Sequence, residues 1–99
     1  MPAINQIAID AILAQRSDLR HTPAGIPALE CVLEHRSLQQ EAGGERRVEC
    51  DVHAVAFGAV AQALSRIVVG ASLRCEGFIA RHYRTGPGIA LHVTRFEQN

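Results

Sequence analysis

Histidine and cysteine side chains are the groups in this sequence that could coordinate a metal ion or take part in catalysis. The chain contains five histidines and three cysteines: His21, His35, His53, His82, His92, Cys31, Cys50 and Cys75. The histidines show no H-E-x-x-H or other familiar ligand spacing, and no two cysteines form a C-x-x-C pair. Glycine-rich phosphate-binding motifs are also missing from the sequence. We therefore expect no catalytic residue, no metal and no cofactor, and we expect that the protein is not an enzyme.

The three cysteines are expected to be small core residues instead. Each of them alternates with polar neighbours, as a buried apolar residue of a strand does. An odd number of widely spaced cysteines is also a poor disulfide framework. The N-terminus lacks the pattern of a secretory signal, and no apolar run approaches the ~20 residues that a membrane span requires. The sequence therefore predicts a reduced, cytoplasmic protein that does not enter a membrane.

Arginine supplies every basic side chain of this sequence, and the formal net charge is zero. A neutral chain does not coat nucleic acid through bulk charge, so any such binding requires a local basic patch. From Arg81 to Arg95 there is no Asp or Glu, and Tyr83 lies next to Arg84. A tyrosine can stack on a base while arginines hold the backbone of a single strand. An ordinary solvated hairpin loop explains the same residues equally well.

Apolar residues alternate with polar ones through much of the chain, which is typical of strands with one buried face. Residues 28–38 and 46–53 alternate most strictly, and a short loop with Gly43-Gly44 joins them, so they predict a β-hairpin. Two later alternating stretches, from Leu73 to Ile79 and from Ile89 to Val93, predict two further strands.

Two segments depart from this clear alternation. Residues 4–14 fit either a strand or a helix. Residues 55–66 have helical spacing, with Phe57 on the apolar side, and predict one short amphipathic helix. The expected order is strand, strand, strand, helix, strand, strand. This order indicates an all-β fold, a five-stranded OB-fold barrel with one short helix between strands 3 and 4, as a single domain over residues 1–99.

The predicted barrel gives the basic residues a possible role. In OB-folds, the surface of the second and third strands and the loop between the fourth and fifth strands grip nucleic acid. Arg36 and Arg47 lie on the outward faces of the second and third expected strands, and Arg20 lies in the first loop. Arg36 shares its strand face with Glu34, so a weak surface ion pair is the alternative interpretation of that arginine.

Several sequence segments resemble one known family. They are Ala24–Pro27 (AGIP), Val32–Ser37 (VLEHRS), Gln40–Gly43 (QEAG) and Glu76–Ile79 (EGFI). These segments resemble the primosomal replication protein N (PriB) family, and the resemblance covers nearly the whole chain. It implies a homodimer of OB-folds that binds single-stranded DNA at stalled forks and contacts the restart helicase PriA and its partner DnaT.

The resemblance also implies roles for particular residues. Arg20, Arg36 and Arg84 match basic DNA-contacting positions of the family, whereas Gly44 and Glu49 stand where better-known members carry aromatic residues. The six candidates for contact with nucleic acid are Arg20, Arg36, Arg47, Arg81, Tyr83 and Arg84. Two alternatives remain open: an adaptor of the primosome with only weak DNA affinity, and an OB-fold that binds RNA.

Overall fold

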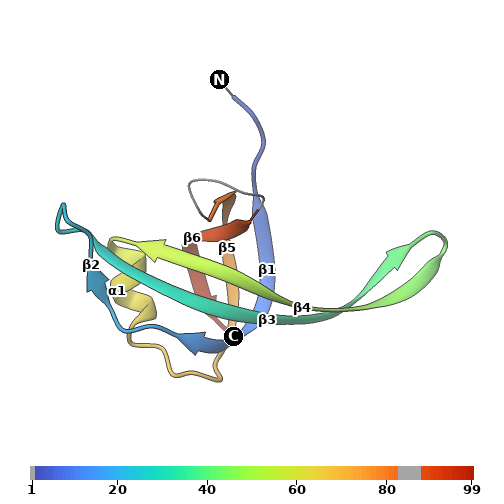
Figure 1. The fold of residues 1–99 in the computed structure, drawn as a ribbon. Coiled ribbons are helices and arrows are strands. Elements are labelled where there is room, and N and C mark those ends of the chain that lie inside the picture. The colour runs from blue at the N-terminus through green and yellow to red at the C-terminus, as the bar shows by residue number, and fades with distance from the viewer. Residues whose placement is uncertain (1, 83–87) are drawn as a thin grey trace.

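Five long strands curl into a closed barrel in the computed structural model, which describes residues 2–82 and 88–99 (Figure 1). The strands pair in the order β1-β5-β6-β4-β3, and β1 also pairs with β3, which closes the ring. The elements are β1 (Ile7–Arg16), β2 (Arg20–His21), β3 (Pro27–Glu41), β4 (Gly44–Phe57), α1 (Ala59–Leu64), β5 (Ser72–Arg81) and β6 (Ile89–Gln98). The expected all-β OB-fold, with one short helix before the last two barrel strands, is confirmed.

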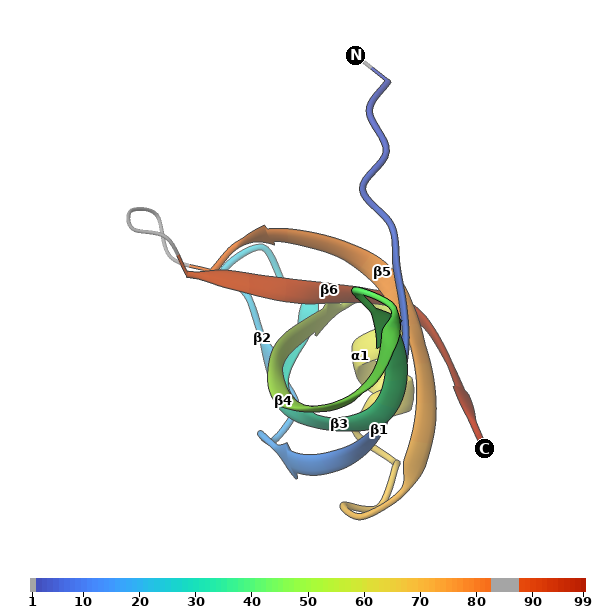
Figure 2. The ribbon, with the colours of Figure 1, turned by 90° about the vertical axis from the view of Figure 1, so that its right-hand side faces the viewer.

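Leucine side chains from β1, β3, β5 and β6 fill much of the interior of this ring, and β4 contributes Ala54 and Ala56. Leu13, Leu29, Leu33, Leu73 and Leu91 are fully buried, as is Leu64 of α1, the helix seen within the ring of strands in Figure 2. The segment 4–14, for which the sequence left strand and helix open, is a strand from residue 7 onward. Its alternate residues Ala11 and Leu13 face the core, while Ile12 lies on the exposed side.

The helix is shorter than the sequence predicts. Strand β4 continues to Phe57, and α1 covers only Ala59–Leu64 rather than residues 55–66. Residues 54–56 are all buried, because β3 pairs with them on one side and β6 pairs with Ala54 and Val55 on the other. Two neighbouring strands outweigh the helical periodicity of this segment, and Gly58, with φ 72°, ends the strand.

The β3–β4 hairpin extends well beyond the barrel (Figure 1). We call residues 35–50 the arm. Its turn is the two-residue pair Ala42-Gly43, with positive φ values of 53° and 79°, which is the type I′ geometry that joins twisted strands. β1 pairs with β3 only as far as Glu34, so the closed part of the barrel ends before the arm begins.

One expectation about the cysteines is wrong because of the arm. Cys31 and Cys75 are buried in the barrel, as predicted, whereas Cys50 is exposed. Cys50 lies on the expected apolar face of β4, opposite His35 of β3. Within the described residues no second layer covers that face, so alternation alone does not bury the thiol. Among the described residues, no helix has the length and apolarity that crossing a membrane requires.

Candidate nucleic-acid interface

An aromatic stack lies on the outer surface of the barrel, across three strands. The rings of Phe78 on β5 and His92 on β6 are 4.8 Å apart between centroids and tilted by only 14°. The ring of Phe57, at the end of β4, has its centroid 5.9 Å from that of His92, and the two ring planes are tilted by 30°. Phe57 and Phe78 are 45% and 39% exposed, although large aromatic side chains usually seek burial. The stack can therefore offer ring surface to a flat ligand.

Strand geometry explains why these three side chains meet. His92 is the cross-strand partner of Phe78 on β5, and it also pairs with Val55 on β4. Leu91 and Val93, on either side of His92, point into the core. Side chains alternate along a strand, so the residue between them faces outward.

The aromatic stack was not predicted from the sequence. Phe57 was expected on the buried side of a helix, which is wrong, because Phe57 belongs to β4 and is exposed. The signal was available in the alternation itself. Phe57 is an even number of residues from the outward Glu49 and Asp51 of the same strand, so it shares their face. Phe78 is an odd number of residues from the buried Leu73 and Cys75, so it lies on the face opposite to theirs.

Charged residues of both signs occupy the outer face of the β3–β4 hairpin. Arg36 Nη2 pairs with Glu34 Oε1 at 3.1 Å, as the alternative interpretation held, and Arg20 Nη1 pairs with Glu30 Oε2 at 3.3 Å. Glu34 also lies directly opposite Asp51 in the hairpin, and facing carboxylates repel each other. Two of the candidate arginines, Arg20 and Arg36, thus form ion pairs with carboxylates and do not lie in a purely basic patch.

The candidate basic residues are spread along the hairpin rather than gathered at one point. In the strand register, Arg20 of β2 lies opposite Ala28 near one end of β3, and Arg47 of β4 lies opposite Leu38 in the arm. Those two partners are ten residue steps apart along β3, which is about 34 Å of strand. Arg36 lies between those two partners on β3. It is the diagonal neighbour of Arg47 on the same face, because Arg36 is opposite Glu49 and Arg47 is opposite Leu38.

Arg81 is the remaining candidate that the structure describes, and it lies outside the β3–β4 hairpin. Arg81 is the last residue of β5 and pairs with Ile89 of β6, close to the stack. Tyr83 and Arg84 lie outside the described residues. The structure thus places Arg36 and Arg47 on the β3–β4 hairpin, Arg20 on β2 beside it, and Arg81 at the end of β5 in the same sheet.

The closed barrel, the long β3–β4 hairpin and the outward aromatic stack define an OB-fold protein of the kind that binds extended polymers on its outer surface. A family described as "another single-strand binding protein family" matches residues 5–95. The single-stranded DNA-binding protein of Thermus aquaticus shares this fold, with a TM-score of 0.78 at 21% identity over 97% of this chain and 50% of that one.

Proteins with higher sequence identity identify the family within this fold. The replication restart protein PriB of Bordetella pertussis is 38% identical over 90 residues, which is 91% of this chain and 84% of that protein. PriB of Nitrosomonas europaea is also 38% identical, over 90% and 82% of the two chains. The structure of PriB from Ralstonia solanacearum matches with a TM-score of 0.90 and 35% identity over 97% of this chain and 98% of that one. The chain belongs to the PriB family of replication restart proteins.

Proposed function

We propose that this protein binds single-stranded DNA during the restart of stalled replication. The observation that carries the proposal is the exposed aromatic stack of Phe78, His92 and Phe57 on the outer face of the barrel. Bases of a single strand can stack on such rings whatever their sequence, because every base has a flat face. Membership of the PriB family supports the same function.

The basic residues would follow the DNA backbone away from the stack. Phe57 lies on the same face of β4 as Arg47, so a strand that leaves the stack can run along the hairpin toward the arm. We propose that phosphates are contacted by Arg20, Arg36, Arg47, Arg81 and Arg84, and that Tyr83 adds a further stacking ring. Arg20 and Arg36 would have to exchange their carboxylate partners for phosphates, which lowers the net gain from each contact.

We further propose the assembly in which the protein acts. Residues 1–99 would act as one OB-fold domain within a cytoplasmic homodimer. The dimer would stabilise the PriA helicase on DNA and help to recruit DnaT, without catalysis of its own. A gel-shift assay with purified PriA on a forked DNA tests this, because a ternary complex should form at PriA concentrations that alone give no shift.

The DNA-binding proposal is tested by fluorescence anisotropy with a labelled single-stranded oligonucleotide and its duplex. The single strand should bind more tightly than the duplex. Phe57→Ala and Phe78→Ala should each weaken binding by about tenfold, since a stacked base contributes about 1–3 kcal/mol. The salt dependence should barely change in these two variants. Val68→Ala is the matched control, because Val68 is an exposed apolar residue outside the stack.

Arginine variants should behave differently from the stack variants. Arg47→Ala should weaken binding and lower the slope of log K against log salt by about 0.7, as expected for one lost phosphate contact to a single strand. Tighter binding to duplex, or unchanged affinity in Phe57→Ala, Phe78→Ala and Arg47→Ala together, would contradict the proposal.

A second candidate function is an adaptor of the primosome that binds DNA only weakly. Glu49 and Asp51 favour it, because neither carboxylate makes an ion pair within the described part of the chain and both lie on the outer face of β4. Glu49→Gln separates the two functions. If DNA follows the arm, the variant binds more tightly at low salt, and the gain shrinks at high salt as charges are screened. Unchanged affinity would place Glu49 off the DNA path, as a solvated strand residue or as part of a face for a protein partner.

A further inference from the structure

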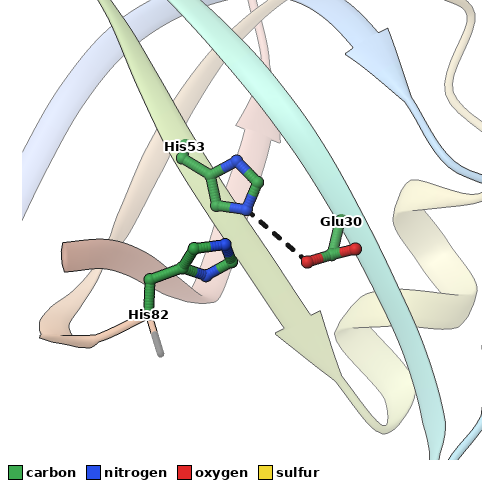
Figure 3. A group of neighbouring side chains, drawn as sticks. All are labelled: Glu30, His53 and His82. Carbon is green, nitrogen blue, oxygen red and sulfur yellow. Dashed lines mark ion pairs between the residues drawn. The ribbon is translucent and has the colours of Figure 1, made fainter. Parts of the chain in front are cut away.

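Glu30, His53 and His82 form a compact cluster on the outside of the barrel (Figure 3). Glu30 belongs to β3, His53 belongs to β4, and His82 directly follows β5. The nitrogen and oxygen atoms that could coordinate an ion all lie within 4.8 Å of one another. The residues are far apart in the sequence, so the spacing rules that detect metal sites in a sequence do not find them.

His53 is the central member of this group. Its Nε2 lies 3.6 Å from Glu30 Oε1, which is too long for a hydrogen bond. The same nitrogen is buried and has no hydrogen-bond partner within the described chain, although part of the ring is exposed. A buried nitrogen without a partner is unfavourable. Two ligands of one tetrahedral zinc ion lie about 3.4 Å apart when each bond is about 2.1 Å, which is close to the observed separation.

His82 and Arg20 complete the geometry. The rings of His53 and His82 are 4.1 Å apart between centroids and tilted by 56°, so a modest side-chain rotation can direct a nitrogen of each ring toward the same point. The backbone N–H of His82 donates to the carbonyl of Gly88 at 2.9 Å, which fixes the chain at this position. Arg20 donates to Glu30 Oε2, which leaves Oε1 directed toward His53. Such outer partners orient the ligands of metal sites.

We propose that Glu30, His53 and His82 bind a divalent transition-metal ion of the zinc class. Two imidazoles and one carboxylate suit Zn²⁺, Co²⁺ or Ni²⁺, whereas Ca²⁺ and Mg²⁺ prefer oxygen ligands alone. Three protein ligands leave a fourth coordination position open. A surface depression of about 310 Å³ borders Glu30 and His53, and it would give a water molecule access from that side. The bound ion would tie the end of β5 to the β3–β4 hairpin.

The site is tested by metal titration of tag-free, metal-depleted protein, without DNA. All variants carry Cys50→Ser, because the exposed thiol of Cys50 could bind metal by itself. Co²⁺ is added while the visible absorption of the tetrahedral ion is followed, and Zn²⁺ is then used to displace it. We expect one ion per chain and a rise in the melting temperature with Zn²⁺, since a ligand of the native state stabilises that state.

Three variants and one control locate the site. His53→Ala, His82→Ala and Glu30→Gln should each weaken binding at least about tenfold, since even outer-partner substitutions weaken metal binding by 10–100-fold. His21→Ala is the control, because His21 is an exposed histidine of β2 outside the cluster. In the NMR spectrum, Zn²⁺ should shift the ring signals of His53 and His82 but not those of His21. Failure to bind at large excess, or equal binding in all three variants, would overturn the proposal.

Discussion

The three cysteines show how burial controls the chemistry of single residues. Burial raises the pKa of the Cys31 thiol to about 12, with a smaller contribution from nearby Cys75, and burial likewise raises the pKa of Cys75 to about 11. A raised pKa keeps both thiols protonated at neutral pH, and the thiolate is the reactive form. Cys50 is exposed on the arm, so a reagent can reach its thiol.

We therefore predict that only Cys50 reacts with a thiol reagent in the folded protein. At about pH 8, at most one thiol per chain should be modified rapidly, whereas all three should react in denaturant. Absorbance with an aromatic disulfide reagent gives the count. Cys50→Ser should abolish the rapid reaction, and rapid modification of Cys31 or Cys75 in the native protein would contradict the buried positions.

Gly77 illustrates a residue whose side chain is excluded by its neighbours. It lies where the β5–β6 register shifts, and a Cβ at this position would overlap the carbonyl oxygen of His92 and lie 2.8 Å from its carbonyl carbon. Backbone atoms held in a sheet cannot move away easily. We predict that Gly77→Ala lowers the free energy of unfolding by about 2–4 kcal/mol, measured by chemical denaturation.

Gly44→Ala is the matched control for that substitution. Gly44 also lies in a strand, but nothing is within 4 Å of the position that its Cβ would take. Its substitution should change stability by no more than about 0.5 kcal/mol. Equal effects of the two substitutions would contradict the role assigned to the contact with His92.

At the scale of elements, the β3–β4 hairpin is the feature that distinguishes this barrel. Its inner half is part of the ring, whereas the arm is held by pairing between its own two strands and by its turn. His35 makes one link back to the barrel, through a contact of 2.6 Å between Nδ1 and the carbonyl oxygen of Asp10. The stability of the arm should therefore depend strongly on the turn.

The turn residue Ala42 gives a direct test. Its φ of 53° is in the left-handed region, which disfavours alanine but suits asparagine, and Asn-Gly is a preferred pair for a type I′ turn. We predict that Ala42→Asn stabilises the arm by about 0.5–1 kcal/mol. Amide hydrogen exchange of arm residues should slow accordingly. Ala42→Val should have the opposite effect, and faster exchange in Ala42→Asn would contradict the turn geometry.

At the scale of the whole molecule, several large apolar side chains stay exposed on one chain. They include Ile4, Ile12, Leu38, Val68 and Ile89. A chain of this size buries a limited share of its surface, and association with a second copy can cover more of it. Light scattering coupled to size exclusion should therefore give about twice the mass of 10.7 kDa, as a dimer with closed two-fold symmetry requires. A monomer mass across a dilution series would contradict the expected homodimer.

The sequence by itself determined the order of the elements and the inward or outward direction of most strand residues. Alternation is a local property, because successive side chains of a strand point to opposite faces whatever lies around them. It was enough to predict the hairpin, the last two strands and the burial of Cys31 and Cys75. The segment around Val32–Ser37 added the resemblance to the PriB family, which the comparisons then confirmed.

Tertiary structure decided which faces are covered and which outward residues meet. Cys50 is exposed because the barrel ends before the arm, and residues 54–56 form a strand because β3 and β6 lie on either side of them. The stack of Phe57, Phe78 and His92 draws its rings from three strands, and Glu30, His53 and His82 likewise come together from β3, β4 and the residue that follows β5. Closure of the barrel sets these contacts, and local periodicity carries no information about which strands become neighbours.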